Sequence, residues 1–131
     1  MEQNEKTKAL LAAFGCALAY LLAGKVLAAV LPQVPEEAAR MWAFVHRCAA
    51  APIVEELVFR GIIQQLARPL GERQAVALQA VLFAVQHRGP AGMAYALVCG
   101  LVLGTLRSRT GSVWPGMLLH TLNNLLVFAA G

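Results

Sequence analysis

The sequence predicts an all-α protein, a polytopic membrane bundle of about five helices that forms a single domain over residues 1–131. Two observations carry this prediction. Hydrophobic residues make up 59% of the chain and charged residues only 14%, whereas a soluble domain carries about 25% charged residues. The basic residues also lie mostly at the ends of long apolar runs, which is the membrane pattern. No basic patch with interleaved aromatic residues accompanies the net charge of +4, so nucleic acid is not an expected partner.

The first two helices are predicted from apolar length and from the prolines between them. Residues 9–31 are mostly apolar and long enough to cross ~30 Å of hydrocarbon. A secretory signal peptide fits this run less well, because it is too long and no clean cleavage site follows it. Pro32 and Pro35 end it, and a second long helix is expected over residues 36–67. Pro52 lies inside that helix and is expected to kink it one turn before Glu55.

Three shorter helices are expected in the second half, over residues 74–87, 92–107 and 113–130. They are short for full spans, which predicts a thinned bilayer or steeply packed helices. Gly100 and Gly104 form a G-x-x-x-G pattern, and we interpret it as close packing within the bundle.

The distribution of basic residues predicts the orientation. An N-terminus on the inner side places six basic residues there and only Arg40 and Arg88 outside; the six are Lys6, Lys8, Arg68, Arg73, Arg107 and Arg109. The positive-inside rule therefore favours an N-in, C-out integral membrane protein, and a bacterial cytoplasmic membrane is the expected location.

The segment A-P-I-V-E-E-L-V-F-R-G (51–61) carries three charges inside an apolar helix. One such charge costs roughly 2.5–3.5 kcal/mol at the bilayer centre, so three indicate a function. Glu56 and Arg60 are four residues apart and can neutralise one another. Glu55 points about 100° away from Glu56 and is therefore left to face something else.

Further polar residues occur at membrane depth: His87 in F-A-V-Q-H, and His120 and Asn124 four apart in H-T-L-N-N. Such groups usually face the interior of a bundle, so all could converge on one pocket with Glu55. A carboxylate in apolar surroundings is a stronger base than one in water, and histidine and amide donors can stabilise an oxyanion. The same glutamate and two histidines could instead bind Zn²⁺, although H-E-x-x-H is missing.

Depth is one difficulty for this convergence. At ~1.5 Å per residue, Glu55 and His120 lie about 12 Å from the inner ends of their helices, whereas His87 lies nearer to about 20 Å. Kinks, or a deeper start for the helix over residues 74–87, would reconcile the three.

At these residues the chain resembles the CPBP intramembrane proteases, also called the CAAX protease and bacteriocin-processing or Abi family. Its motifs E-E-x-x-x-R, F-x-x-x-H and H-x-x-x-N are matched in order, within residues 48–128, by Glu55, Glu56 and Arg60, by Phe83 and His87, and by His120 and Asn124. The resemblance implies a glutamate-dependent protease without a metal. It implies that Glu55 and His87 activate water. It further implies that His120 and Asn124 stabilise the oxyanion, and that Glu56 and Arg60 position the site.

We therefore expect an intramembrane endopeptidase that acts on a membrane-associated peptide or protein tail and needs no cofactor. A non-catalytic immunity or scaffold protein is the alternative, and a zinc protease is a weaker one. The metal-free expectation also rests on the lack of a further carboxylate to partner the histidines. Five helices are fewer than the family commonly has, so the site would open to lipid or need a second copy to close it. A prenylated CAAX tail, a bacteriocin leader and a sorting helix all remain open as substrates.

Overall fold

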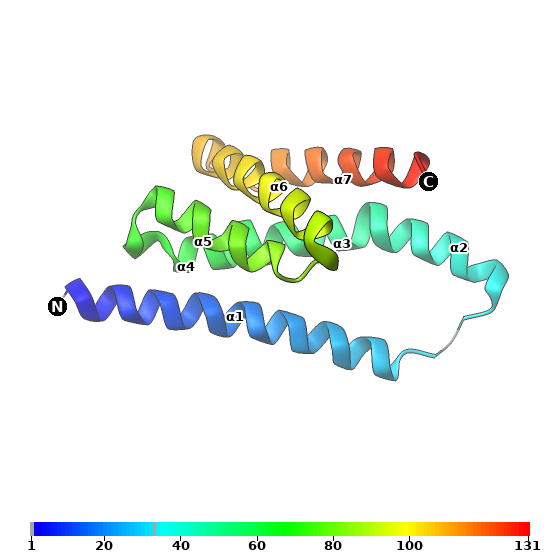
Figure 1. Cartoon of the computed structure of the whole chain (residues 1–131), viewed down its shortest axis with the longest axis horizontal. Coiled ribbons are helices and arrows are strands. Elements are labelled where there is room, and N and C mark those ends of the chain that lie inside the picture. Colours follow the sequence, from blue (N-terminus) through cyan, green and yellow to red (C-terminus); the bar gives the residue numbers. More distant parts are fainter. Residues whose placement is uncertain (1, 33) are drawn as a thin grey trace.

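The computed structural model describes residues 2–32 and 34–131, and helices joined by short turns account for almost all of them. The chain makes five helical passes in this part, as the sequence predicts (Figure 1). The first is α1 (Glu2–Val30), which begins before the apolar run. Its polar first turns carry Glu2 and Glu5, and acidic residues stabilise the N-terminus of a helix. All-α architecture is thereby confirmed, with no strand in the described residues.

The second pass is one continuous central helix with changing hydrogen-bond registers. It comprises α2 (Glu36–Val45), the π-helical η1 (His46–Ala50), α3 (Ala51–Glu55), the π-helical η2 (Glu56–Ile63) and α4 (Gln64–Leu66). A single 3-10 turn, η3 (Arg68–Leu70), follows it. The perturbation expected at Pro52 thus takes the form of a π-helical turn directly before the proline, a change that often marks functional sites.

The remaining passes are α5 (Glu72–Ala84), α6 (Gly89–Thr110) and α7 (Trp114–Ala129). Gly71 and Gly111, with φ of +115° and +70°, form the turns before α5 and after α6, a backbone conformation that glycine adopts without strain. At 22 residues, α6 is longer than the sequence predicted and needs no thinned bilayer, whereas α5 and α7 have 13 and 16 residues.

Helices α5 and α6 pack closely, and the G-x-x-x-G pattern explains why. A Cβ atom added at Gly100 would lie 2.9 Å from the Cα of Ala80 in α5, and one at Gly104 would lie 2.3 Å from Nε2 of Gln79. Gln79 donates from Nε2 to the carbonyl of Gly100 at 2.8 Å. The packing interpretation of the two glycines is therefore confirmed.

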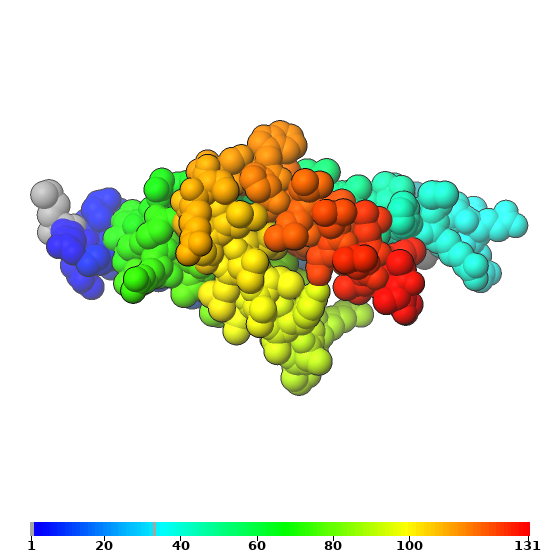
Figure 2. All heavy atoms as spheres, turned by 90° about the horizontal axis from the view of Figure 1, so that it is seen from above, coloured from blue at the N-terminus to red at the C-terminus, as the bar shows by residue number. Residues whose placement is uncertain are grey.

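Two helices among the described residues, α1 and α6, are long and apolar enough to cross a membrane. Both expose large apolar side chains, including Leu11, Leu18 and Val98. In Figure 1 the N-terminus, the α4–α5 turn and the α6–α7 turn lie at one end of the molecule, and the C-terminus lies toward the other. In Figure 2, α6 and α7 cover one face side by side.

Candidate active site

Glu56 is the centre of a buried ion-pair cluster. Its Oε1 lies 3.0 Å from NH1 of Arg60, and both side chains are fully buried. The same Oε1 accepts a hydrogen bond of 2.9 Å from Nδ1 of His120 in α7. The predicted Glu56–Arg60 pair is thus present, and it is attached to a third residue that lies 64 positions along the chain.

Glu55 contacts the other nitrogen of the same imidazole. Its Oε2 lies 3.6 Å from Nε2 of His120, and its side chain is 19% exposed, whereas that of Glu56 is not exposed at all. His120 therefore lies between the two carboxylates. Glu56 is occupied by two partners, and Glu55 retains access to the surroundings of the bundle, as the difference in their helical directions predicted.

Both ring nitrogens of His120 face a carboxylate oxygen, Nδ1 that of Glu56 and Nε2 that of Glu55. Arg60 is the cation paired with Glu56. The geometry therefore places an imidazole nitrogen, which can donate or accept a proton, beside the more exposed of the two carboxylates.

His87 follows α5 and joins the cluster through Phe83. Its Nδ1 lies 3.0 Å from the carbonyl oxygen of Phe83, which only accepts, so Nδ1 carries the proton and Nε2 of the neutral ring is left as an acceptor. The Phe83 ring lies 4.7 Å from the His87 ring and 5.9 Å from the His120 ring. Phe83 thus separates and orients the two histidines.

The end of α5 lies beside the central helix rather than at the end of the bundle. In Figure 1 the α5–α6 turn is placed partway along the length of the molecule, near α3. The two predicted histidines both lie beside Phe83, His87 at 4.7 Å and His120 at 5.9 Å between ring centres.

A row of aromatic side chains, Tyr20, Phe59 and Phe83, packs against Arg60 of the cluster, and most of it was not predicted from the sequence. Phe59 is fully buried, and its ring packs edge-on against Tyr20 at 5.5 Å and against Phe83 at 5.1 Å. The Arg60 guanidinium carbon lies 4.5 Å from the centre of the Phe83 ring, a cation–π contact. A phenylalanine directly before a buried arginine was the available signal for Phe59; nothing in the sequence indicated Tyr20.

Asn124 lies one turn beyond His120, and its amide contacts the main chain of the central helix. Its Nδ2 donates to the carbonyl oxygen of Arg47 at 2.8 Å. Its neighbour Asn123 contacts α6 instead, accepting a hydrogen bond from the Tyr95 hydroxyl. The predicted oxyanion role of Asn124 stays a prediction; one of its two amide hydrogens is already used.

An apolar pocket of about 200 Å³ lies beside His120, between α6 and α7. Its other lining residues are Val98, Cys99, Val102, Leu103, Leu119 and Asn123. The His120 imidazole therefore borders a space suited to an apolar side chain.

A match to a family model decides the family. Residues 37–126 match the model described as type II CAAX prenyl endopeptidase Rce1-like. The chain belongs to this Rce1-like family. No curated protein and no solved structure matches the chain.

Membership confirms the resemblance drawn from the three motifs and identifies a family of peptidases. Together with the apolar helices α1 and α6, it makes the chain an integral membrane protein. The match begins near the start of α2, so α1 with Tyr20 lies outside it. All six predicted site residues lie within the Rce1-like match.

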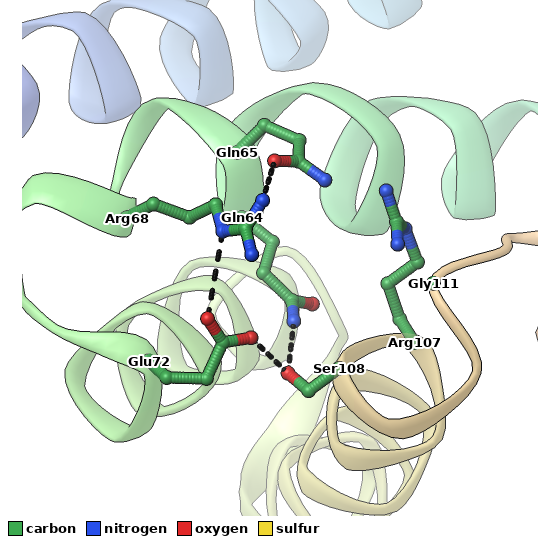
Figure 3. A pocket seen from close by; sticks show the side chains of 7 residues that line it. All are labelled: Gln64, Gln65, Arg68, Glu72, Arg107, Ser108 and Gly111. Atoms are coloured by element: carbon green, nitrogen blue, oxygen red, sulfur yellow. Dashed lines mark hydrogen bonds and ion pairs between the residues drawn. The ribbon is translucent and has the colours of Figure 1, made fainter.

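A second pocket of the Rce1-like domain is polar and occupies about 160 Å³ near the α4–α5 end (Figure 3). Gln64 is buried and donates from Nε2 to the Gly104 carbonyl and to Ser108 Oγ, both at 3.0 Å, while Ser108 in turn donates to Glu72. This network joins α4, α5 and α6, and we interpret it as structural because its side chains mostly bond to one another.

One ground for the metal-free expectation fails. No carboxylate was expected to partner the histidines, but Glu56 accepts a hydrogen bond from Nδ1 of His120, as a partner of a metal-ligating histidine does. Within the described residues, no three histidine, cysteine or acidic side chains are grouped so as to hold a metal ion.

Gly116 allows α7 to approach Glu56, and its substitution gives a first prediction. A Cβ atom at this position would lie 2.7 Å from Oε2 of Glu56. In Gly116→Ala the carboxylate must move, and with it the contacts to Arg60 and His120. We expect the cleavage rate to fall about tenfold or more, because small displacements of reacting groups have large effects. The control is Gly15→Ala, where a Cβ meets nothing within 4 Å, and equal rates for the two variants would contradict the prediction.

Proposed function

We propose that the protein is a glutamate-dependent intramembrane endopeptidase that cleaves a membrane-associated peptide or protein tail. The observation that carries this proposal is the unequal environment of the two glutamates. Glu56 is fully buried between Arg60 and His120, whereas Glu55 is partly exposed and has only the longer contact of 3.6 Å to His120. Glu55 is therefore the carboxylate whose oxygens a water molecule can reach.

In the proposed mechanism, a water molecule is held between Glu55 and His87. Nε2 of His87 is an acceptor because Nδ1 donates to the Phe83 carbonyl, so the water can donate one hydrogen to each group. Glu55 takes a proton as the water oxygen attacks the peptide carbonyl. That proton then passes to the amide nitrogen as the C–N bond breaks. One fragment is released with a free amino group and the other with a new carboxyl group that holds the oxygen of the water.

His120 is the proposed oxyanion donor. Its Nδ1 is directed to Glu56, so Nε2 is the ring nitrogen left to face the substrate. Nε2 lies 3.6 Å from Oε2 of Glu55, and the ring borders the apolar pocket. In the proposed mechanism Nε2 carries a proton when it donates to the oxyanion. Asn124 donates to the Arg47 main-chain carbonyl, and we propose that it positions α7 rather than contacting the oxyanion. Glu56 and Arg60 orient His120 rather than contact the substrate.

The pocket beside His120 supports an apolar residue next to the cleaved bond. Its walls are aliphatic apart from His120, Asn123 and Cys99. We propose a tail that enters from the bilayer between α6 and α7, with the N-terminus of the chain on the inner side. A prenylated tail, a leader peptide and a sorting helix all fit this description.

A zinc-dependent mechanism is the second candidate. A histidine that binds zinc usually donates its other ring N–H to a carboxylate, as His120 does to Glu56. Elemental analysis and a cleavage assay on chelator-washed protein in detergent separate the two. We expect full activity with zinc far below one equivalent. Stoichiometric zinc, with loss of cleavage on its removal and recovery on its return, would establish the metal enzyme instead.

A further inference from the structure

We propose that Asn124 is a positioning residue: its amide holds the Arg47 carbonyl, which Pro52 leaves without a helical donor, and so fixes α7 on the central helix. The hydrogen bond from Asn124 Nδ2 to this oxygen measures 2.8 Å and joins residues 77 positions apart. The effect on catalysis rests on the proposed function; the bond itself does not.

The π-helical register identifies the missing donor. In η1 the N–H of Ala51 bonds to the carbonyl of His46, five residues earlier. The next bond in this register would join the N–H of residue 52 to the carbonyl of Arg47. Residue 52 is proline and has no N–H, so that carbonyl needs another donor. A carbonyl without one is costly inside a bilayer, where water is not at hand.

The amide of Asn124 supplies that donor, and a second contact accompanies it. Cys48 Sγ lies 3.8 Å from the main-chain oxygen of Asn124, in range of a weak S–H hydrogen bond. One turn earlier on α7, His120 bonds to Glu56. Side-chain hydrogen bonds thus join helix α7 to the central helix at two levels, at Arg47 and at Glu56.

Two hydrogen bonds fix the orientation of α7 on the central helix, which a single bond would leave free to change. The His120–Glu56 bond alone would let α7 pivot about His120 and change the distance between Nε2 and Glu55. The Asn124–Arg47 bond removes that pivot, because its acceptor is main chain and cannot rotate away. Asn124 therefore determines the 3.6 Å separation of His120 and Glu55 through α7 without touching either side chain.

The test restores the missing donor. Wild type, Asn124→Ala, Pro52→Ala and the double variant are purified in one detergent, and kcat on an apolar tail peptide and the melting temperature are measured for each. We expect Asn124→Ala to lower kcat about tenfold or more in the wild-type background. In the Pro52→Ala background the new N–H can bond to the carbonyl, so we expect a loss below about threefold. The melting temperature should show the same rescue.

Asn123→Ala is the matched control. It removes the same kind of side chain from the neighbouring position, where the amide oxygen accepts a hydrogen bond from Tyr95 rather than contacting Arg47. Its effect should be equal in both backgrounds. Pro52 is buried, so Pro52→Leu, which has an N–H and more volume, replaces Pro52→Ala if the latter does not fold. Equal losses from Asn124→Ala in both backgrounds would overturn the proposal, and so would rescue of the melting temperature alone. If wild type cleaves nothing, the proposed function fails, while the melting temperatures still test the bond.

Discussion

Replacing Glu56 by glutamine is expected to destabilise the protein strongly and to remove its activity. The change leaves Arg60, whose side chain is fully buried, without its anion, and breaking a buried ion pair costs roughly 3–5 kcal/mol. His120 also loses the carboxylate that accepts from its Nδ1 and orients its ring. The free energy of unfolding in detergent and the cleavage rate should therefore fall together.

A double variant shows whether the lost pairing is the cause. Glu56→Gln with Arg60→Met removes the orphaned cation and should recover part of the stability, although not the activity, since His120 still lacks its carboxylate. The matched control is Glu5→Gln, which makes the same change in an exposed pair with Lys8 at 3.0 Å and should cost less than about 1 kcal/mol. A Glu56→Gln protein as stable as this control would contradict the buried-pair account.

Replacing Glu55 by glutamine is expected to remove activity and leave the fold intact. A general base contributes about 10²–10⁴-fold to a rate, and the amide cannot take a proton from water. Glutamine is nearly isosteric with glutamate, and the Glu56–Arg60 and Glu56–His120 bonds do not involve Glu55. The melting temperature should therefore stay the same or rise, because one partly buried charge is removed.

The contrast between the two glutamates also separates an enzyme from a binding protein. In a non-catalytic immunity or scaffold protein, Glu55→Gln would keep its full effect in cells. Measured kcat, together with the melting temperature of both variants, distinguishes loss of chemistry from loss of fold. Parallel loss of activity and stability in Glu55→Gln would show that Glu55, like Glu56, is structural.

Helical spacing was sufficient to predict which residues share a face, and much of the site follows from it. Glu56 and Arg60 do pair, and the glycines of α6 do face α5. Spacing carries no information on which helices adjoin, so the bonds of His120 to Glu56 and of Asn124 to Arg47 were not predicted.

The π-helical segments and the aromatic row were harder to predict for a different reason. A π-helical segment of a few residues is too short to produce a recognisable pattern of apolar side chains. Pro52 was the one local indication that the helix is perturbed there. Tyr20 reaches the site because α1 packs on Phe59, a tertiary contact that apolar composition alone does not specify. The depth of His87 likewise depends on where α5 lies in the bundle.

Hydrolysis in ¹⁸O-labelled water tests whether Glu55 activates water to cleave a peptide bond. Purified wild type and Glu55→Gln are incubated in lipid nanodiscs with an apolar tail peptide, and the products are analysed by mass spectrometry. The account predicts one new carboxylate carrying a single ¹⁸O with wild type, and intact peptide with Glu55→Gln at an unchanged melting temperature. The same labelled product from Glu55→Gln at the wild-type rate would contradict it.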